Sequence, residues 1–150
     1  MNTAKKIHDL YEIDAYKWFS ENAKLLREKK FDLIDIENLA EEVESMGRSE
    51  EKELFSILTQ LFLHLLKWKY QPERRGSSWE ISIKKQRMHF MRHLKKNPSL
   101  KGHIDEIVKD AYEDAVLDAQ KATKLPAKTF QKKMPFTLKD AIKDGWFPDE

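Results

Sequence analysis

A strongly apolar stretch that runs into a basic, aromatic turn constrains the fold of this chain most. Apolar side chains recur at helical spacing from Leu54 to Trp68, on a face broad enough for the centre of a bundle. Pro72 lacks a backbone N–H and disfavours helical geometry at Gln71. The pattern therefore predicts a central core helix that stops near Pro72. The turn that follows is expected to pack against other residues of the protein or to bind a partner.

The composition favours a single helical domain over residues 1–150. The chain is long enough for one real core, and it has only four Gly and five Pro, which favours long helices over a turn-rich sheet. It has no Cys, so disulfides, thiolate nucleophiles and Cys-ligated zinc or iron–sulfur sites are excluded.

The sequence shows no membrane-spanning or secretory segment. The longest apolar candidate, residues 54–66, is interrupted by polar residues and is shorter than the roughly 18 residues that suggest a span. The opening Met-Asn-Thr-Ala-Lys-Lys is not followed by the apolar stretch of a signal peptide. We therefore expect a cytoplasmic protein with no membrane partner.

Helical periodicity also organises the N-terminal half. Residues 11–30 place their apolar side chains on one face, which predicts one helix over this range. Asp35 fits the N-cap of a second helix. Gly47 should weaken or kink that helix, and Ser49 could cap a restart. Residues 36–70 are therefore either one kinked helix or two helices.

Helix start signals recur in the C-terminal half. Ser77 or Ser78 is expected to cap the helix that follows the turn. Asn97 followed by Pro98 is a start signal for the next helix, because Pro suits the first helical position. The apolar spacing extends that helix to about Lys124.

The C-terminal tail is unusually aromatic. Residues 130–148 contain several aromatic side chains, so we expect the tail to be strapped over the bundle, with a short helix near 137–143. The predicted fold is therefore all-α: a compact helical bundle of about five main helices plus a C-terminal strap.

Charge is unevenly placed along the chain. Residues 32–53 contain nine acidic side chains against two basic ones, and residues 64–103 contain eleven basic side chains against two acidic ones. The simpler interpretation is that acidic segments of the same chain or of a partner subunit neutralise the basic segment. The alternative is a basic face that binds nucleic acid.

Arginine and aromatic side chains cluster around the Pro72 turn. They could clamp a phosphate or stack a nucleobase. Alternatively, Arg stacks on Trp while its planar fork pairs with a carboxylate, which would explain Arg rather than Lys at these positions. The candidate binding residues are Trp68, Tyr70, Arg74, Arg75, Trp79 and Arg87, and the candidate charge partners are Glu37, Glu41 and Glu44.

Histidine and glutamate patterns do not predict a metal site or a cofactor. His89 and His93 are four residues apart, so on one helix face they could share a metal with His64 or a carboxylate as third ligand. Surrounding Lys and Arg disfavour a cation, and the Glu of a His-Glu-x-x-His motif is absent. We therefore expect no metal and no cofactor. A cleft holding His64 with Glu41 or Glu44 would instead indicate an enzyme.

Four segments, spread over nearly the whole chain, share their order and spacing with a known family. They are Tyr11-x-x-Asp14-x-Tyr16-x-Trp18, the run 37–50, the run 64–79, and Leu125-Pro126 with Pro135-Phe-Thr-Leu138. Together they resemble the small helical proteins named domain of unknown function 29. The resemblance implies an all-helical fold in a bacterial-type cytoplasmic protein, and it implies no reaction and no catalytic residue.

These patterns favour a non-catalytic protein-interaction or assembly module that binds a protein partner or a second copy. The alternative hypothesis is a nucleic-acid-binding protein that uses the basic helix over residues 84–101. The partners of the basic side chains distinguish the two hypotheses, because arginines paired with carboxylates would weaken the nucleic-acid hypothesis.

Overall fold

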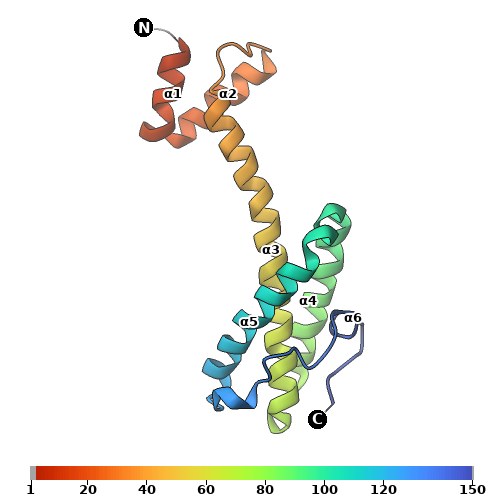
Figure 1. The fold of residues 1–150 in the computed structure, drawn as a ribbon. Coiled ribbons are helices and arrows are strands. Elements are labelled where there is room, and N and C mark those ends of the chain that lie inside the picture. Colours follow the sequence, from red (N-terminus) through yellow and green to blue (C-terminus); the bar gives the residue numbers. More distant parts are fainter. Residues whose placement is uncertain (1–2, 150) are drawn as a thin grey trace. The chain divides into compact units, whose positions relative to one another are not determined.

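The chain folds into helices joined by short turns (Figure 1). The computed structural model describes residues 3–149 and contains no β-strand in that range, so the predicted all-α fold is confirmed. The α-helices are α1 (Thr3–Ile13), α2 (Ala15–Arg27), α3 (Ile36–Tyr70), α4 (Ser77–Lys96), α5 (Ile104–Thr123) and α6 (Leu138–Ala141). Short 3₁₀ turns form η1 (Pro72–Arg74), η2 (Pro98–His103) and η3 (Ala127–Thr129).

The fold divides into two compact units, one up to Ser49 and one from Glu50 onward. α1, α2 and the first part of α3 build the first unit. The rest of α3, together with α4, α5, α6 and the tail, builds the second unit. That residues 1–150 form a single domain stays a prediction.

The first unit begins with two helices where the sequence predicted one. Asp14 leaves helical geometry between α1 and α2, and its Oδ1 accepts a hydrogen bond from the Lys17 N–H at 3.1 Å. The prediction of one helix over residues 11–30 is therefore wrong, because Asp14 caps a new helix. Of the apolar face predicted for this segment, Trp18 and Leu25 are buried, whereas Phe19 and Leu26 are exposed.

A buried carboxylate, Asp35, connects the helices of the first unit. Its Oδ2 accepts hydrogen bonds from Trp18 Nε1 at 2.8 Å and from Asn38 Nδ2 at 2.9 Å. Its Oδ1 lies 3.2 Å from His8 Nδ1, and its backbone N–H donates to Asn22 Oδ1 at 2.9 Å. Asp35 stands directly before α3, at the predicted cap position, and its side chain serves as the polar centre of the unit.

The apolar core of the first unit is small. Ile7, Trp18 and Leu25 are buried there, and partly buried neighbours pack against them. Many large apolar side chains of this unit remain exposed: Ile13, Tyr16, Phe19, Leu26, Phe31, Ile36, Val43 and Met46.

α3 is one continuous helix, which resolves the choice that the sequence left open. Gly47 lies inside it, because a Gly costs only about 1 kcal/mol relative to Ala in a helix and good helix formers flank this one. The helix ends two residues before Pro72, as predicted, and Gln71 leaves helical geometry. Although α3 has 35 residues, neither it nor any other described helix is apolar enough over sufficient length to cross a membrane.

The core of the second unit is built around α3, which lies between α4 and α5 (Figure 1). This confirms the prediction that the segment from Leu54 to Trp68 is the central core helix. The buried apolar side chains that the three long helices contribute to this core come from α3 (Leu54, Ile57, Leu58, Leu61, Phe62, Leu65, Leu66), α4 (Ile83, Phe90) and α5 (Ile107, Ala111, Tyr112, Ala115, Ala119).

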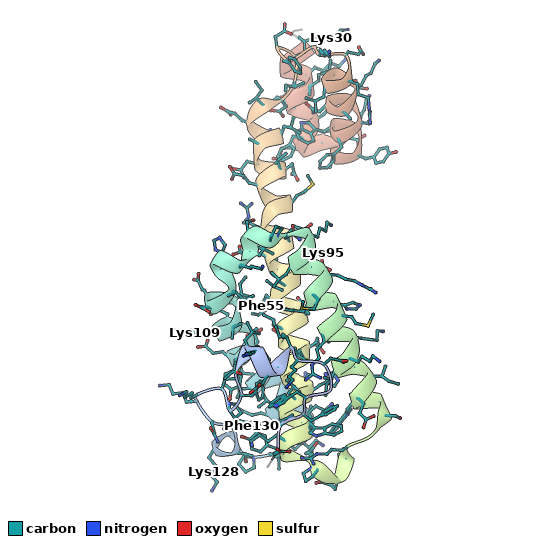
Figure 2. The ribbon with its side chains drawn as sticks, turned by 90° about the vertical axis from the view of Figure 1, so that its right-hand side faces the viewer. Lys30, Phe55, Lys95, Lys109, Lys128 and Phe130 are labelled. Carbon is teal, nitrogen blue, oxygen red and sulfur yellow. The ribbon has the colours of Figure 1, made fainter. Side chains whose placement is uncertain are left out.

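The C-terminal tail packs on this core, as predicted. Phe130, drawn in Figure 2, and Phe136 are buried in the core cluster. The ring of Phe147 stacks on Trp68 of α3 with centroids 4.3 Å apart. The helix in the tail, α6, is shorter than the predicted range 137–143 and lies inside it.

Two helix starts differ from the prediction. α4 begins at Ser77 with Gly76 in the cap position, so the prediction that Ser77 or Ser78 caps this helix is wrong. Pro98 begins the 3₁₀ turn η2, and the α-helical conformation starts only at Ile104. The fixed φ of Pro suits both helix types, so the sequence signal marked the start of a turn and not its type.

Candidate functional site

The outer side of α4 carries an apolar stripe among lysines and arginines. Ile81, Met88 and Met91 follow one another at helical spacing, and Met91 exposes 57% of its surface. Ile83 and Phe90, on the opposite side, are buried in the core, so α4 does not need the stripe for its own packing. An apolar surface left exposed on a well-packed helix is typical of a binding surface.

Two neighbouring hollows of about 420 and 570 Å³ lie along this stripe. Met91 and Arg92 line both hollows, and we call the two hollows together the methionine groove. The other lining residues are Lys84, Arg87, Met88, Ile142 and Asp144 in the first hollow and Leu94, Lys95, Pro98 and Lys101 in the second.

The rim of the methionine groove is basic. Lys84, Arg92, Lys95 and Lys101 are exposed, and none of them forms an ion pair with another described residue. Over residues 3–149, Lys96 is the one Lys or Arg of the basic segment within 4.0 Å of a carboxylate. Within the described part of the second unit, direct ion pairs therefore neutralise little of the basic segment.

The first unit carries a surface of the opposite charge. Along the first part of α3, apolar side chains are exposed at helical spacing on one side of the helix, and glutamates are exposed on another side. We call this surface the acidic stripe: its apolar residues are Ile36, Val43 and Met46, and its glutamates are Glu37, Glu41 and Glu44.

Arg75 connects the turn after α3 to Trp68. Its Nε–H donates to the Trp68 carbonyl oxygen at 2.7 Å, and its guanidinium lies 5.3 Å from the centre of the Trp68 ring. The Arg75 guanidinium thus lies over the Trp68 ring, as in the alternative in which Arg stacks on Trp. Its hydrogen-bond acceptor is a backbone carbonyl oxygen and not a carboxylate. Arg74, its neighbour in sequence, is exposed.

Arg87 reaches from α4 to the tail. Its Nε–H donates to the Ala141 carbonyl oxygen at 2.8 Å, and its Nη2 donates to the carbonyl oxygen of Trp146. Its guanidinium also lies 5.8 Å from the centre of the Phe147 ring. Burial lowers the pKa of Arg87, and nearby Asp144 opposes that shift. Arg87 therefore holds the tail on α4.

The remaining candidate binding residues lie near the end of α3. The ring of Tyr70 meets Phe130 edge-on at 5.2 Å, and burial raises the pKa of its hydroxyl. The Tyr70 hydroxyl has no hydrogen-bond partner among the residues described. Trp79 lies under the ammonium of Lys67, 4.8 Å from the ring centre. These residues pack around the turn, whereas Arg87 contacts the tail.

The candidate charge partners lie elsewhere in the fold. Glu37, Glu41 and Glu44 are exposed residues of the first unit, and Glu44 lies 3.8 Å from Arg48. The hydrogen-bond acceptors of Arg75 and Arg87 are backbone carbonyls. Pairing of the glutamates with the arginines of the turn stays a prediction.

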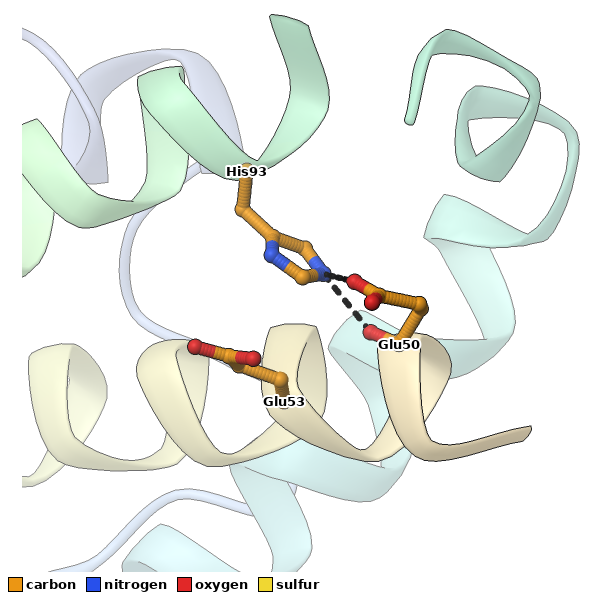
Figure 3. A group of neighbouring side chains, drawn as sticks. All are labelled: Glu50, Glu53 and His93. Carbon is orange, nitrogen blue, oxygen red and sulfur yellow. Dashed lines mark hydrogen bonds and ion pairs between the residues drawn. The ribbon is translucent and has the colours of Figure 1, made fainter. Parts of the chain in front are cut away.

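A histidine and two glutamates meet where α4 crosses α3 (Figure 3). His93 is buried, and its Nε2 lies 2.7 Å from the backbone carbonyl oxygen of Glu50 and 3.6 Å from Glu50 Oε2. Glu53 projects from the next turn of α3 beneath the same ring (Figure 3). Asn97 donates to Glu50 Oε2 at 3.1 Å, so this carboxylate also joins the end of α4 to α3.

The other histidines of the sequence hypotheses are separate from this cluster. His89 is exposed on α4. His64 Nδ1 lies 2.8 Å from the carbonyl oxygen of Gln60 in its own helix, and burial lowers its pKa. Glu41 and Glu44, its suggested partners, belong to the first unit. The hypothesis of a His64 cleft therefore gains no support from the contacts of His64.

Sequence reasoning missed both the methionine groove and the histidine cluster. The groove had a signal, because Ile81, Met88 and Met91 share a helix face opposite the buried one. The cluster had none, since 43 positions separate Glu50 from His93 and only the packing of α4 on α3 brings them together.

Comparison with known proteins identifies the family. The model of the family described as domain of unknown function DUF29 matches residues 10–147. The chain belongs to this family. The DUF29 match confirms the resemblance found from the sequence, and it covers both units. No curated protein and no solved structure matches the chain. The DUF29 description specifies no activity, so the surfaces of this chain carry the functional argument.

Proposed function

We propose that this DUF29 protein is a self-assembly module in which the methionine groove of one copy holds the acidic stripe of a second copy. The observation that supports this is chemical complementarity. The groove is lined by Met88 and Met91 and by exposed Lys and Arg side chains, and the stripe has exposed apolar residues on one side of its helix and glutamates on another. Apolar contact supplies binding energy, and opposite charges steer association and fix the register.

The side chains of the groove suit a helical partner. Methionine is flexible and polarisable, so Met88 and Met91 can adapt to apolar side chains that enter from a facing helix. The acidic stripe lies on an α-helix and offers Ile36, Val43 and Met46 at the spacing of such anchors. Each copy has one groove and one stripe, so this interface is heterologous and can extend beyond a dimer.

Nucleic acid is the competing occupant of the basic rim. The cations of Lys84, Arg92 and Lys101 could contact phosphates, but the apolar side chains of Met88 and Met91 that line the groove give a phosphate no favourable contact. Asp144 at one end would repel it. We expect no binding of duplex or single-stranded oligonucleotides tighter than about micromolar at physiological salt, the usual nonspecific level.

A charge-swap experiment tests the self-assembly directly. The groove variant carries Lys84→Glu, Arg92→Glu and Lys95→Glu, and the stripe variant carries Glu37→Lys, Glu41→Lys and Glu44→Lys. Sedimentation velocity should show that the parent associates at micromolar concentration and that each variant alone is monomeric. A mixture of the two variants should associate again, because the exchanged charges are complementary.

The matched control reverses two exposed lysines outside the groove, Lys109→Glu and Lys121→Glu, and should associate like the parent. Raised salt should weaken association of the parent, because exposed charges are screened over about 8 Å at physiological ionic strength. A parent that stays monomeric contradicts the proposal. Submicromolar oligonucleotide binding that the groove variant loses would favour the nucleic-acid hypothesis instead.

A further inference from the structure

The geometry points to a binding site for a divalent first-row transition-metal ion, formed by Glu50, Glu53 and His93 in the second unit. One ring nitrogen of His93 and one carboxylate oxygen of each glutamate lie within 4.8 Å of one another. Ligands held at about 2.0–2.2 Å from one zinc ion lie at most about 4.4 Å apart. Nε2 faces Glu50 and the other ring nitrogen faces away from it, so binding one ion through Nδ1 requires the Glu50 carboxylate to turn around the ring toward Nδ1 and Glu53.

His93 distinguishes this cluster from an ordinary group of surface carboxylates. Its side chain is only 7% exposed, and its Nε2 is 2.7 Å from the Glu50 carbonyl oxygen. A carbonyl only accepts hydrogen bonds, so Nε2 carries a proton and donates it, and Nδ1 is the ring nitrogen left to bind a metal ion. Among residues 3–149, no hydrogen bond involves that nitrogen. Histidines that bind metals commonly donate their second N–H to a carbonyl in this way.

The two glutamates are placed to supply the negative charge. Glu50 and Glu53 are three residues apart on α3, so they project from the same side of the helix. Asn97 donates to Glu50 Oε2 and orients that carboxylate, as an outer-shell partner does. Lys96 lies 3.8 Å from Glu50 Oε1, but its exposed, flexible side chain can move away.

Glu53 has no structural task that competes with metal binding. Its side chain is exposed, and it makes no hydrogen bond or ion pair with the residues described. Figure 3 shows its carboxylate beneath the His93 ring, on the side away from Glu50. A carboxylate that is free to turn toward a buried imidazole is available as a ligand.

The donor set indicates the kind of metal. One imidazole nitrogen and two carboxylate oxygens suit Zn²⁺ and its first-row neighbours, whereas Ca²⁺ and Mg²⁺ prefer oxygen ligands alone. Three protein ligands leave a position for water. This site differs from the His89–His93 pair that the sequence suggested and then disfavoured, because the glutamates replace His89.

Zn²⁺ titration of the full chain tests the site, with competition against a chromophoric chelator and excess Mg²⁺ to suppress weak binding to surface carboxylates. We expect one Zn²⁺ per chain. Glu53→Gln should weaken Zn²⁺ binding about tenfold or more, since even outer-shell changes weaken metal sites by 10–100-fold. Glu53→Gln should keep the parent's circular dichroism, because Glu53 is exposed and unbonded.

Two control variants should bind Zn²⁺ like the parent: His89→Ala, on the next turn of α4, and Glu106→Gln, an exposed carboxylate on α5. In NMR spectra, the ring nitrogens of His93 should shift at one equivalent of Zn²⁺. The proposal is overturned if the parent takes up no stoichiometric Zn²⁺, if Glu53→Gln binds as tightly as the parent, or if binding depends on His89. None of these three results bears on self-assembly, which does not use Glu50, Glu53 or His93.

Discussion

The first unit is organised around a buried carboxylate, whereas the second unit is organised around an apolar helix. Asp35 receives hydrogen bonds from Trp18 and Asn38, and the apolar core around them is small. In the second unit, α3 supplies a continuous series of buried Leu and Phe side chains that α4, α5 and the tail cover. Directional bonds to one charged group therefore stabilise the first unit, and burial of apolar area stabilises the second.

The two units also differ in how many large hydrophobic side chains they expose. Among the described side chains, eight large hydrophobic residues are exposed in the first unit and four in the second. A unit that leaves so much apolar surface in water gains stability from a partner that binds its folded form. This difference is what we expect if the acidic stripe of the first unit is covered in an assembly.

Removing a core aromatic side chain should give the largest effect. Phe62 of α3 is fully buried, so Phe62→Ala should lower the free energy of unfolding of the second unit by about 3–5 kcal/mol, through lost burial and a cavity. Phe31→Ala, the same change at an exposed position, should cost less than about 0.5 kcal/mol. Urea denaturation followed by circular dichroism measures both. Equal effects would mean that the α3 core does not carry the stability of this unit.

Removing the carboxylate of the first unit should give the second-largest effect. Asp35→Ala leaves the buried Trp18 indole N–H without its acceptor, which should cost the first unit about 2–3 kcal/mol. Asp32→Ala, an exposed acidic neighbour, is the matched control. The near-ultraviolet circular dichroism of Trp18 reports the change. An Asp35→Ala protein with a parent-like signal and stability would remove Asp35 from its central role.

The two adjacent arginines at the turn should differ in how much they contribute to the stability of the fold. Arg75→Ala loses the bond to the Trp68 carbonyl and the stacking on its ring, so we expect a loss of about 1–2 kcal/mol. Arg74→Ala, at an exposed position, should cost less than about 0.5 kcal/mol. Arg75→Lys should not fully restore stability, because Lys lacks the planar fork. Thermal melts that rank Arg74 above Arg75 would contradict this assignment.

The smallest expected effect is a pH dependence confined to the first unit. Burial raises the pKa of Asp35, but hydrogen bonds from Asn38, Trp18 and His8 outweigh burial, so the net pKa lies below its ordinary 3.8. The hydrogen bond to Asp35 raises the pKa of His8 above 6.5.

The signs of these two shifts define a window of best stability. A lowered carboxyl pKa stabilises the folded form above pH 3.8, and this contribution is lost as the pH falls through the folded pKa. A raised histidine pKa stabilises the folded form below pH 6.5, and this contribution is lost as the pH rises through the pKa of the folded form. The protection factors of the first unit, which correct for the intrinsic pH dependence of amide exchange, should therefore be highest between these limits. His8→Gln should abolish the alkaline change and keep the acidic one.

Sequence patterns predicted the elements that rest on strong local rules. The apolar periodicity of 54–68 and the missing N–H of Pro72 located the central helix and its end. The break at Asp14 was missed because the same residue type can lie inside a helix or cap one, and the backbone angle decides. Gly47 was given too much weight, since one Gly cannot end a helix with good helix formers on both sides.

The candidate site was less predictable, because it depends on contacts between distant segments. The sequence marked Arg87 as a candidate binding residue, which stays a prediction, and its acceptors in the structure are carbonyl oxygens of the tail, which carry no side-chain signal. Likewise, His93 was considered with His89, its neighbour on the helix, and with His64 or a carboxylate that the sequence could not identify. Its actual contacts with Glu50 depend on how α4 packs against α3.

The contrast between the two units is tested most directly by hydrogen exchange, measured peptide by peptide in Asp35→Ala and Phe62→Ala. We predict that Asp35→Ala accelerates exchange in residues 7–35 and leaves residues 54–66 near the parent rate. Phe62→Ala should accelerate exchange in residues 54–66 and 104–123. If Asp35→Ala accelerates exchange in residues 54–66 as much as in residues 7–35, the two units are stabilised by one shared set of interactions and the account is contradicted.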